Sequence, residues 1–287
     1  MARLFDLVVM VDWSAASKPG PRRESKDQIW FAWGAPGHRP APVYCRTRDE
    51  AFERLRDLLA RHAGNVLIGF DFPNGYPTGS GLGGGRKVAA RLAAIVVDGL
   101  DNRSNRFVVA RKLNRALGHP PGPFWMCPAT EAGPTLTVTR PPFHGRAFGE
   151  YRIVDRRLRA RRKYPQSVWK LCGAGAVGSQ CLLGLAVVDR LLTTPALAAR
   201  SRVWPFETGW DAKLGGIIHA EIWPSLFALD GQRHPIKDAR QVAAVRDALI
   251  ATDRRGALRA WFARPEGLSE AENRICLEEE GWILGVR

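Results

Sequence analysis

The sequence predicts an α/β fold: one core of strands and helices that carries a large, mostly helical insertion. Three observations predict it. Short apolar runs typical of buried strands recur near both ends of the 287-residue chain, and helical patterns follow them. Between residues 77 and 215 the sequence pattern changes: helical patterns there alternate with glycine-rich and proline-rich stretches. With 45% hydrophobic residues the chain can bury a sizeable core, which excludes an intrinsically disordered protein.

The first 75 residues show the order strand, strand, strand, helix, strand. The apolar run at residues 7–11 and the aromatic and β-branched segments at 28–34 and 42–46 are typical of strands. Thr47 is placed to cap a helix that continues to about residue 62, with apolar side chains on one face. A further buried strand follows at residues 66–72.

The remaining elements divide between the insertion and the core. Within the insertion, residues 77–215, we expect a glycine-rich segment at 79–85 and helices near 86–100, 152–163, 167–192 and 195–201. After it we expect a strand at 216–223, helices at 236–252 and 256–262, and a tail, 280–287, that forms a short strand or a packed extension. The chain is therefore read as one domain, residues 1–287, with its core at 1–75 and 216–287.

Composition limits the compartment and the partners. The formal net charge is +15, and arginine supplies 35 of the 43 basic residues, which codon bias explains as readily as phosphate binding. A field of that sign attracts nucleic acid or phosphorylated small molecules. The five cysteines are scattered without a CxxC pair, which favours a reducing compartment. No apolar run approaches the ~20 residues of a membrane span, so we expect a soluble, cytoplasmic protein that does not enter a membrane.

Four acids stand where otherwise apolar elements end. Asp12 follows the first strand, Asp71 and Glu221 lie within later strands, and Asp238 begins a helix. A carboxylate in an apolar strand is costly unless it is paired, hydrogen-bonded or metal-bound. Each acid alone is equally well explained as a turn cap or an arginine partner. Together, with Asp12 and Asp71 on adjacent central strands, they predict an all-oxygen site suited to Mg²⁺ or Mn²⁺.

Several motifs carry a resemblance to a known family. The segments VDWSAAS, IGFDFPNGYP, AEIWPS and KDARQ, with SVWKLCGAGAVGSQ, VWPFE and EGWILG, cover most of the chain. They resemble domain-of-unknown-function family 429, an uncharacterised branch of the ribonuclease H-like superfamily. The resemblance implies a ribonuclease H-like mixed β-sheet core with flanking helices, and the family has no established activity.

The resemblance to ribonuclease H-like nucleases and resolvases also implies a ligand set. It places metal ligands at Asp12 and Asp71, adds Asp238 from the late helix, and makes Glu221 a further carboxylate. Related resolvases often carry a second acid three residues after the helical one, whereas this chain has Gln241 there. Two metal ions ~3.5–4 Å apart would activate water and stabilise the leaving oxygen of a phosphodiester, and the thinner acid set puts that two-metal chemistry in question.

Candidate substrate-binding residues surround these acids. Trp13 and Trp223 neighbour Asp12 and Glu221, and such aromatics either stack a flat substrate or belong to the core. Ser14 and Asn74 follow the first and fourth strands closely. Between Arg152 and Lys163, seven of twelve residues are basic. This segment is either a solvated helix face or a phosphate-binding face, with the candidates Arg156, Arg157 and Arg161.

Two other motifs suggest competing functions. Residues 173–178 match GxGxxG, but no buried strand precedes them and no acid follows at the distance that a dinucleotide site requires. These glycines therefore favour close helix packing, with an anion at the helix start as an alternative. The loop from Asp12 to Ser17 resembles the phosphate loop of the actin and sugar-kinase superfamily, but the second glycine-rich loop of that superfamily is missing.

Three functions follow from these residues. The first is a Mg²⁺- or Mn²⁺-dependent phosphodiester hydrolase, nuclease-like, with Asp12, Asp71, Glu221 and Asp238 as its acids. The second is an enzyme for a phosphorylated or nucleotide-like small molecule, in a pocket roofed by the insertion and closed by residues 79–85. The third is a non-catalytic nucleic-acid-binding protein. The sequence leaves the oligomeric state open.

Overall fold

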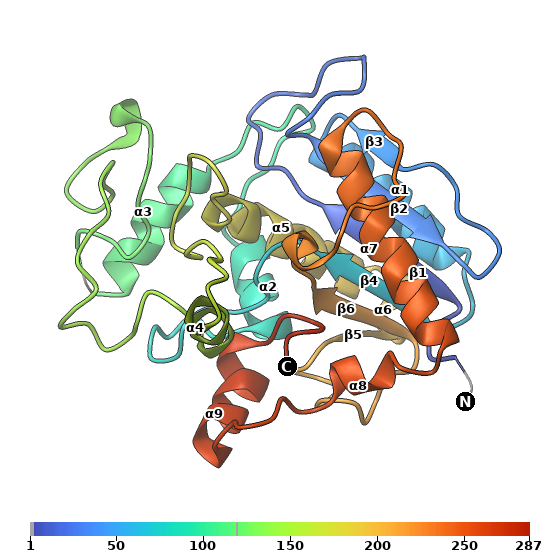
Figure 1. The fold of residues 1–287 in the computed structure, drawn as a ribbon. Coiled ribbons are helices and arrows are strands. Elements are labelled where there is room, and N and C mark those ends of the chain that lie inside the picture. The colour runs from blue at the N-terminus through green and yellow to red at the C-terminus, as the bar shows by residue number, and fades with distance from the viewer. Residues whose placement is uncertain (1–2, 119) are drawn as a thin grey trace.

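The computed structural model describes residues 3–118 and 120–287, and it forms a mixed α/β structure around a six-stranded sheet (Figure 1). The strand order across the sheet is β3-β2-β1-β4-β6-β5. The strands are β1 (Leu7–Asp12), β2 (Ile29–Gly34), β3 (Val43–Cys45), β4 (Val66–Phe70), β5 (Ser201–Val203) and β6 (Ile217–Glu221).

The sheet changes from antiparallel to parallel at its centre. β1 pairs antiparallel with β2, and β2 with β3, whereas β1–β4, β4–β6 and β6–β5 are parallel pairs. The central strands are continuous apolar runs buried on both faces, as parallel strands covered by helices require. In this register Val11 lies beside Phe70, and Phe70 beside Glu221. The residues that end β1, β4 and β6 therefore meet at one edge of the sheet.

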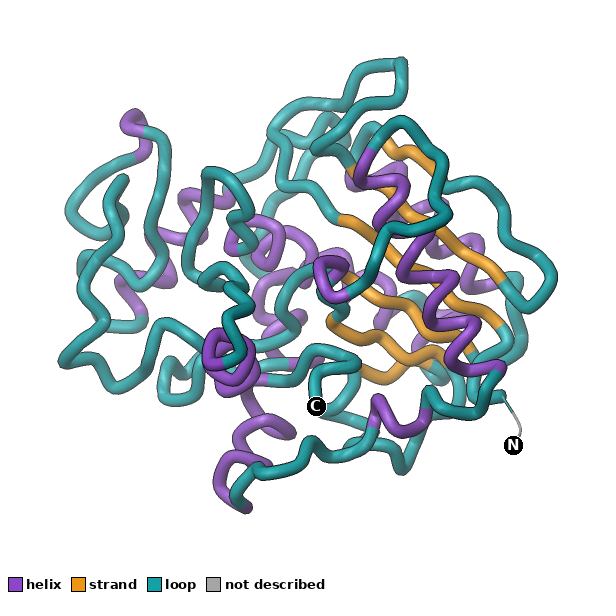
Figure 2. The backbone as a smooth tube through the Cα atoms, in the orientation of Figure 1, coloured by secondary structure: helices purple, strands orange, loops and turns teal. Residues whose placement is uncertain are grey.

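Helices cover both faces of the sheet (Figure 2). α7 contacts β1 and β2 on one face, while α5 contacts both α1 and α2 on the other. Alternate residues of β1 accordingly divide between two cores: Val9 and Val11 on the α5 side, Val8 and Met10 on the α7 side. The helices are α1 (Arg48–Ala60), α2 (Gly85–Ala93), α3 (Arg106–Ala116), α4 (Ile153–Ala160), α5 (Gly178–Thr193), α6 (Pro195–Ala198), α7 (Lys237–Arg254), α8 (Arg259–Phe262) and α9 (Glu270–Ile275). Single turns lie at Ala129–Glu131, Pro224–Leu226 and Cys276–Glu280.

The sequence predictions for the core strands and for α1 are confirmed. The Thr47 side chain accepts a hydrogen bond from the Glu50 nitrogen and caps α1, as expected. Most helix predictions in and after the insertion were too long, and two of them by the largest margins. α2 ends at Ala93, before the β-branched run of residues 95–97. α5 begins only at Gly178, because Gly173 and Gly175 take left-handed backbone angles, φ 84° and 68°, that interrupt a helix.

The division into core and insertion also needs correction. Residues 77–215 were expected to lie outside the core, but they supply the edge strand β5 and the helix α5, which lies against the sheet. β5 is only three residues long and carries no clear strand pattern. The C-terminal tail forms a packed extension, in which Ile283 makes a single bridge to Glu221.

Two further features concern the whole chain. The five cysteines are free thiols, as their scattered spacing predicted. Across the residues that the structure describes, no helix combines the length and the apolar character needed to cross a membrane.

A buried arginine joins the insertion to the sheet. Arg152, 1% exposed, precedes α4, and its guanidinium donates to both carboxylate oxygens of Glu221 at 2.6 and 2.7 Å. It also donates to Asp155, at 3.0 and 3.1 Å, and to the Glu280 carbonyl oxygen at 3.2 Å. Burial alone would lower the pKa of Arg152, but Asp155 and Glu221 outweigh it and raise that pKa well above its ordinary value. α4, β6 and the C-terminal turn are thus held at one point.

We expect Arg152→Met to lower the free energy of unfolding by about 3–5 kcal/mol, because it leaves two buried carboxylates without their cation. Chemical denaturation at pH 7.5 measures the effect. Arg156→Met is the matched control, since Arg156 lies on the same helix with an exposed side chain, and its effect should stay within about 0.5 kcal/mol. Equal stabilities of the two variants would contradict the role given to Arg152.

His219 lies at the centre of β6 with its ring buried. It stacks on Phe70, with ring centroids 6.5 Å apart, and its Nε2 lies 3.3 Å from the Ser201 hydroxyl. Burial, with a smaller contribution from Arg86, lowers the pKa of His219 to about 3. The histidine is therefore a neutral residue of the protein core in the folded state, whereas the unfolded chain takes up a proton near pH 6.5.

This difference predicts a pH dependence of stability. Between pH 6.5 and 5 the unfolded state binds up to one more proton at this site than the folded state, so the contribution of His219 to the free energy of unfolding falls as the pH is lowered. The slope from one such group is at most about 1.4 kcal/mol per pH unit. We expect His219→Gln to remove that slope and exposed His144→Gln to keep it, in denaturation curves recorded from pH 7.5 to 5. An unchanged slope in His219→Gln would count against this assignment.

Candidate functional site

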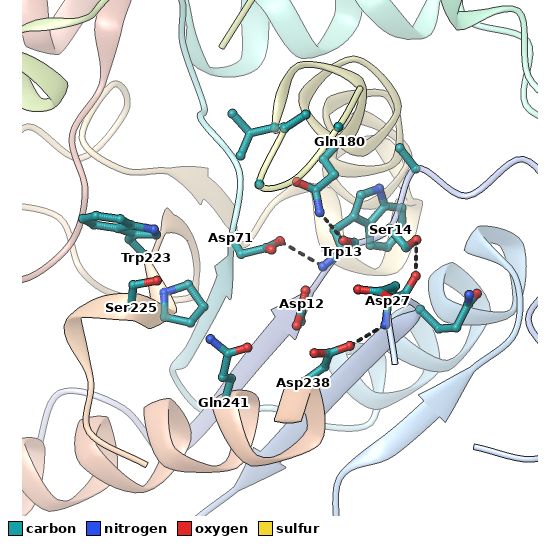
Figure 3. Close-up of a pocket in the computed structure, with 17 residues that line it drawn as sticks. Asp12, Trp13, Ser14, Asp27, Asp71, Gln180, Trp223, Ser225, Asp238 and Gln241 are labelled. Carbon is teal, nitrogen blue, oxygen red and sulfur yellow. Dashed lines mark hydrogen bonds between the residues drawn. The ribbon is translucent and has the colours of Figure 1, made fainter. Parts of the chain in front are cut away.

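A pocket of about 440 Å³ lies where β1 and β4 end (Figure 3). Its lining comes from segments that are far apart in the sequence. Four aspartates, Asp12, Asp27, Asp71 and Asp238, face it. The loop before α5 and the first turn of that helix form a second wall, and residues 223–225 form a third. The register of the parallel strands therefore brings together the acids that the sequence singled out at the ends of β1 and β4.

Asp12 and Asp71 form the centre of the site. The Asp71 carboxylate accepts a hydrogen bond from the Trp13 backbone nitrogen at 2.9 Å, which fixes it beside β1. The two carboxyl groups are close enough to influence each other's pKa. Burial, the charge of Asp71 and the charge of Asp238 raise the pKa of Asp12 well above its usual range. Burial raises the pKa of Asp71 to about 6, against the opposing effect of the Trp13 hydrogen bond.

Asp238 lies in the first turn of α7, where a carboxylate is favoured by the helix dipole. One of its oxygens accepts a hydrogen bond from the Asp27 backbone nitrogen at 2.6 Å. Burial raises the pKa of Asp238, while the Asp27 nitrogen, Lys237 and Lys26 lower it. Asp238 thus holds the loop between β1 and β2 against α7 (Figure 1).

Sequence reasoning missed Asp27. This residue has a left-handed backbone, φ 59°, and its carbonyl oxygen accepts a hydrogen bond from the Ser14 hydroxyl at 3.0 Å. Strained backbone of this kind is concentrated at functional sites, but it leaves no sequence signal in a non-glycine residue. Gln180, on the first turn of α5, was also missed. Its side-chain amide donates to the Trp13 carbonyl oxygen.

The glycine-rich loop before α5 closes the pocket opposite the acids. Gly173, Gly175, Ala176 and Val177 line it, so that the N-terminus of α5 points toward the aspartates. Gly178 packs tightly, because a Cβ there would lie 2.6 Å from the Lys170 carbonyl oxygen. The close packing expected of this motif is therefore present. The N-terminus of a helix also presents unpaired N–H groups and partial positive charge, which attract anions.

The other candidates around the acids have different surroundings. Ser14 and Trp223 line the pocket. Trp13 also borders it, but its ring is 1% exposed and packs on Phe70 and Phe72. Asn74 is buried and does not line the pocket, and its backbone nitrogen donates to Glu221.

The structure does not bring Glu221 to the pocket. Both of its carboxylate oxygens are committed to Arg152, and it is absent from the lining. Burial raises its pKa and Arg152 opposes the rise. Position at the end of an apolar strand could not distinguish Glu221 from Asp71, because the arginine that pairs with Glu221 lies 69 residues away in the chain.

The basic segment at residues 152–163 also lies outside the pocket. Arg156 donates to the Tyr151 carbonyl oxygen, and Arg157 donates to that of Glu266. Arg157 and Arg161 line a separate cavity with Trp261 and the C-terminal residues. The density of basic residues in this segment therefore does not mark the wall of the acidic site.

The donor set of the pocket consists of carboxylate oxygens. In residues 3–118 and 120–287, no three His, Cys, Asp or Glu side chains are gathered closely enough to hold a metal ion. The three-aspartate ligand set is therefore not assembled in this structure, because Asp238 is turned toward Asp27. Among the other aspartates, Asp71 has the largest effect on the pKa of Asp12. Mg²⁺ is commonly bound by one or two carboxylates, with water and substrate phosphate as its other ligands, so this pair fits such an ion.

Comparisons with known proteins indicate no function for this chain, so a function is inferred from the pocket alone. No protein-family model, no curated protein and no solved structure matches the chain.

The repulsion between the two central acids predicts a change in stability. Because the pKa values of Asp12 and Asp71 are raised, the folded state holds a proton that the unfolded state releases, and the contribution of these two acids to the free energy of unfolding falls as the pH rises from about 4 to above 6. Asp12→Asn removes one of the charges. We expect it to raise the free energy of unfolding at pH 8, in metal-free buffer, by about 1 kcal/mol or more.

Denaturation curves at pH 5 and pH 8 with EDTA measure this effect. Asp230→Asn is the control and should leave the pH dependence unchanged, because Asp230 is exposed in the loop before α7 and lies outside the pocket. A destabilised Asp12→Asn protein at pH 8 would contradict the repulsion.

Proposed function

We propose that this protein is a Mg²⁺- or Mn²⁺-dependent phosphodiester hydrolase built on a ribonuclease H-like core. One observation carries the proposal. Two neighbouring aspartates, Asp12 and Asp71, line a single pocket together with the glycine-rich loop that leads into α5. One side of the pocket thus suits a cation and the other an anion, which is the pairing that a metal-bound phosphate presents. The strand order, with antiparallel β3, β2 and β1 followed by parallel strands, supports the assignment of the core.

The residues of the chain have separate roles in this proposal. Asp12 and Asp71 hold the cation, and the Trp13 nitrogen keeps Asp71 in place. The N–H groups at the start of α5, other than that of Gly178, which donates to the Lys170 carbonyl oxygen, receive phosphate oxygens. Gln180 and Gln241 line the pocket with amide groups that can orient a substrate. A divalent ion in such a site stabilises negative charge on the phosphoryl group and lowers the pKa of a bound water.

A second function is favoured by the size of the pocket. A volume of about 440 Å³ falls within the range of small-molecule sites, so a phosphorylated or nucleotide-like metabolite is the alternative substrate. The insertion contributes a wall through Gly173–Val177, but residues 79–85, expected to close the pocket, do not line it. A non-catalytic nucleic-acid binder is favoured least, because the acids then have no role in the pocket.

The proposal predicts metal-dependent hydrolysis of a simple phosphodiester such as thymidine 5′-p-nitrophenyl phosphate. We expect Asp12→Asn and Asp71→Asn to lower kcat/KM at least about 100-fold, as removal of a group that stabilises the transition state does, and EDTA to abolish turnover. Release of nitrophenolate at pH 8 with Mg²⁺ or Mn²⁺ measures it. Asp230→Asn is the control and should keep full activity.

The same variants give a readout that does not require turnover. Mn²⁺ should raise the melting temperature of the wild type and of Asp230→Asn, and leave that of Asp12→Asn unchanged. A folded wild type that neither hydrolyses a phosphodiester nor gains stability from Mg²⁺ or Mn²⁺ would overturn the proposed function.

A further inference from the structure

A second cavity adjoins the acidic pocket. Its volume is about 630 Å³, and it shares Asp27 and Asp238 with the pocket. The loop before β2 forms one side and the first turn of α7 the other. We name this cavity the basic groove, after the four cations that line it: Arg23, Lys26, Lys237 and Arg240.

The four groove cations differ from many other basic residues of the protein. Arginines elsewhere, such as Arg48, Arg86 and Arg111, form ion pairs with acids. Among the residues that the structure describes, no ion pair involves any of the four groove cations, and the Arg240 Nε is buried without a hydrogen-bond partner. Three acids also line the groove: Asp27 and Asp238, which it shares with the pocket, and Glu24, which lies 3.4 Å from His234.

The groove lies beside the acidic pocket, and this position indicates a role for its four cations. A pocket with four aspartates repels a phosphate, so an anionic substrate needs cations close by. Lys26 and Lys237 are near enough to lower the pKa of Asp238. Four cations in one groove exceed what a single phosphate in the pocket requires, whereas a chain of phosphates would occupy all of them.

The opposite side of the pocket offers a different surface. Trp223 lies across Asp12 from Asp27 (Figure 3), half-buried in the pocket wall beside Pro224. Sites for single-stranded nucleic acid combine an aromatic face, on which bases stack, with a row of cations that the backbone follows. Here the two lie on opposite sides of the pocket, so that one strand crossing the pocket could contact both.

We propose that the basic groove binds the backbone phosphates of a single nucleic-acid strand, which continues through the acidic pocket toward Trp223. The inference rests on the proposed function only in placing a phosphodiester of that strand beside Asp12 and Asp71. It relocates nucleic-acid binding from the basic segment at residues 152–163 to the loop before β2 and the start of α7.

Binding without cleavage tests the groove. The probe is a fluorescein-labelled 20-nucleotide single-stranded DNA of mixed sequence, measured by anisotropy in EDTA at several salt concentrations. The groove variant combines Arg23→Gln, Lys26→Gln, Lys237→Gln and Arg240→Gln. The surface variant combines Lys112→Gln, Arg115→Gln, Lys163→Gln and Arg274→Gln, which removes the same net charge from exposed side chains outside the groove. Thermal melts establish that both variants are folded.

We expect the groove variant to raise Kd about tenfold or more. The dependence of log K on log salt should fall by about 0.7 for each phosphate that the groove no longer binds. The surface variant should change Kd by less than about threefold. Trp223→Ala should weaken binding without changing the salt dependence, because it removes stacking and leaves the charges in place.

The outcomes separate the two proposals. Equal weakening in the groove and surface variants, or equal affinity of the wild type for single-stranded and duplex DNA, would overturn the groove assignment even if the wild type hydrolyses the small phosphodiester. Groove-dependent strand binding by a protein that hydrolyses no phosphodiester would leave the groove standing and remove the proposed reaction.

Discussion

The buried guanidinium of Arg152 is the interaction on which the rest of the structure depends. It joins α4 of the insertion to the end of β6 and to the C-terminal turn, three parts of the chain that share no continuous helix or strand. Because Glu221 is held there, the segment that follows β6 leaves the sheet in a fixed direction and carries Trp223 to the pocket wall. A buried ion pair adds little net stability over well-packed apolar groups, so its main effect here is positional: it determines where the insertion sits relative to the sheet.

The acidic pocket follows from the change of strand direction at β1. Antiparallel β2 brings the β1–β2 loop back over the sheet edge, and parallel β4 ends beside β1, so Asp12, Asp27 and Asp71 meet there. Hydrogen bonds from the Trp13 nitrogen to Asp71 and from the Asp27 nitrogen to Asp238 then hold the strand ends and the loop in place. The insertion then contributes the N-terminus of α5 from the opposite side. The aspartates therefore come from the predicted core, residues 1–75 and 216–287, and the positive helix end comes from the predicted insertion, residues 77–215.

The pairing of Asp12 with Asp71 could be predicted from sequence. Each acid lies at the end of an apolar strand of the sheet, and neighbouring parallel strands end at the same edge. The ion pair of Glu221 could not be predicted, since its partner, Arg152, lies far away in the sequence. Asp27 was hidden for another reason: its placement depends on a left-handed backbone angle that any short polar loop could contain. Local charge density also misled, because it singled out residues 152–163, whereas the cations beside the acids come from two separate segments. The three residues of β5 were too few to show a period.

The hydrogen bond from the Asp27 nitrogen to Asp238 has a thermodynamic consequence. The loop before β2 belongs both to the acidic pocket and to the basic groove, and this bond ties it to α7. A ligand that moves the loop in one cavity must therefore act on the other through the same few atoms. Linkage makes any such coupling reciprocal. If an ion bound at the aspartates changes the affinity of the groove for an anion by some factor, the anion changes the affinity of the pocket for the ion by the same factor. The Asp27–Asp238 hydrogen bond is thus the point of the structure at which any coupling between the two cavities would be measured.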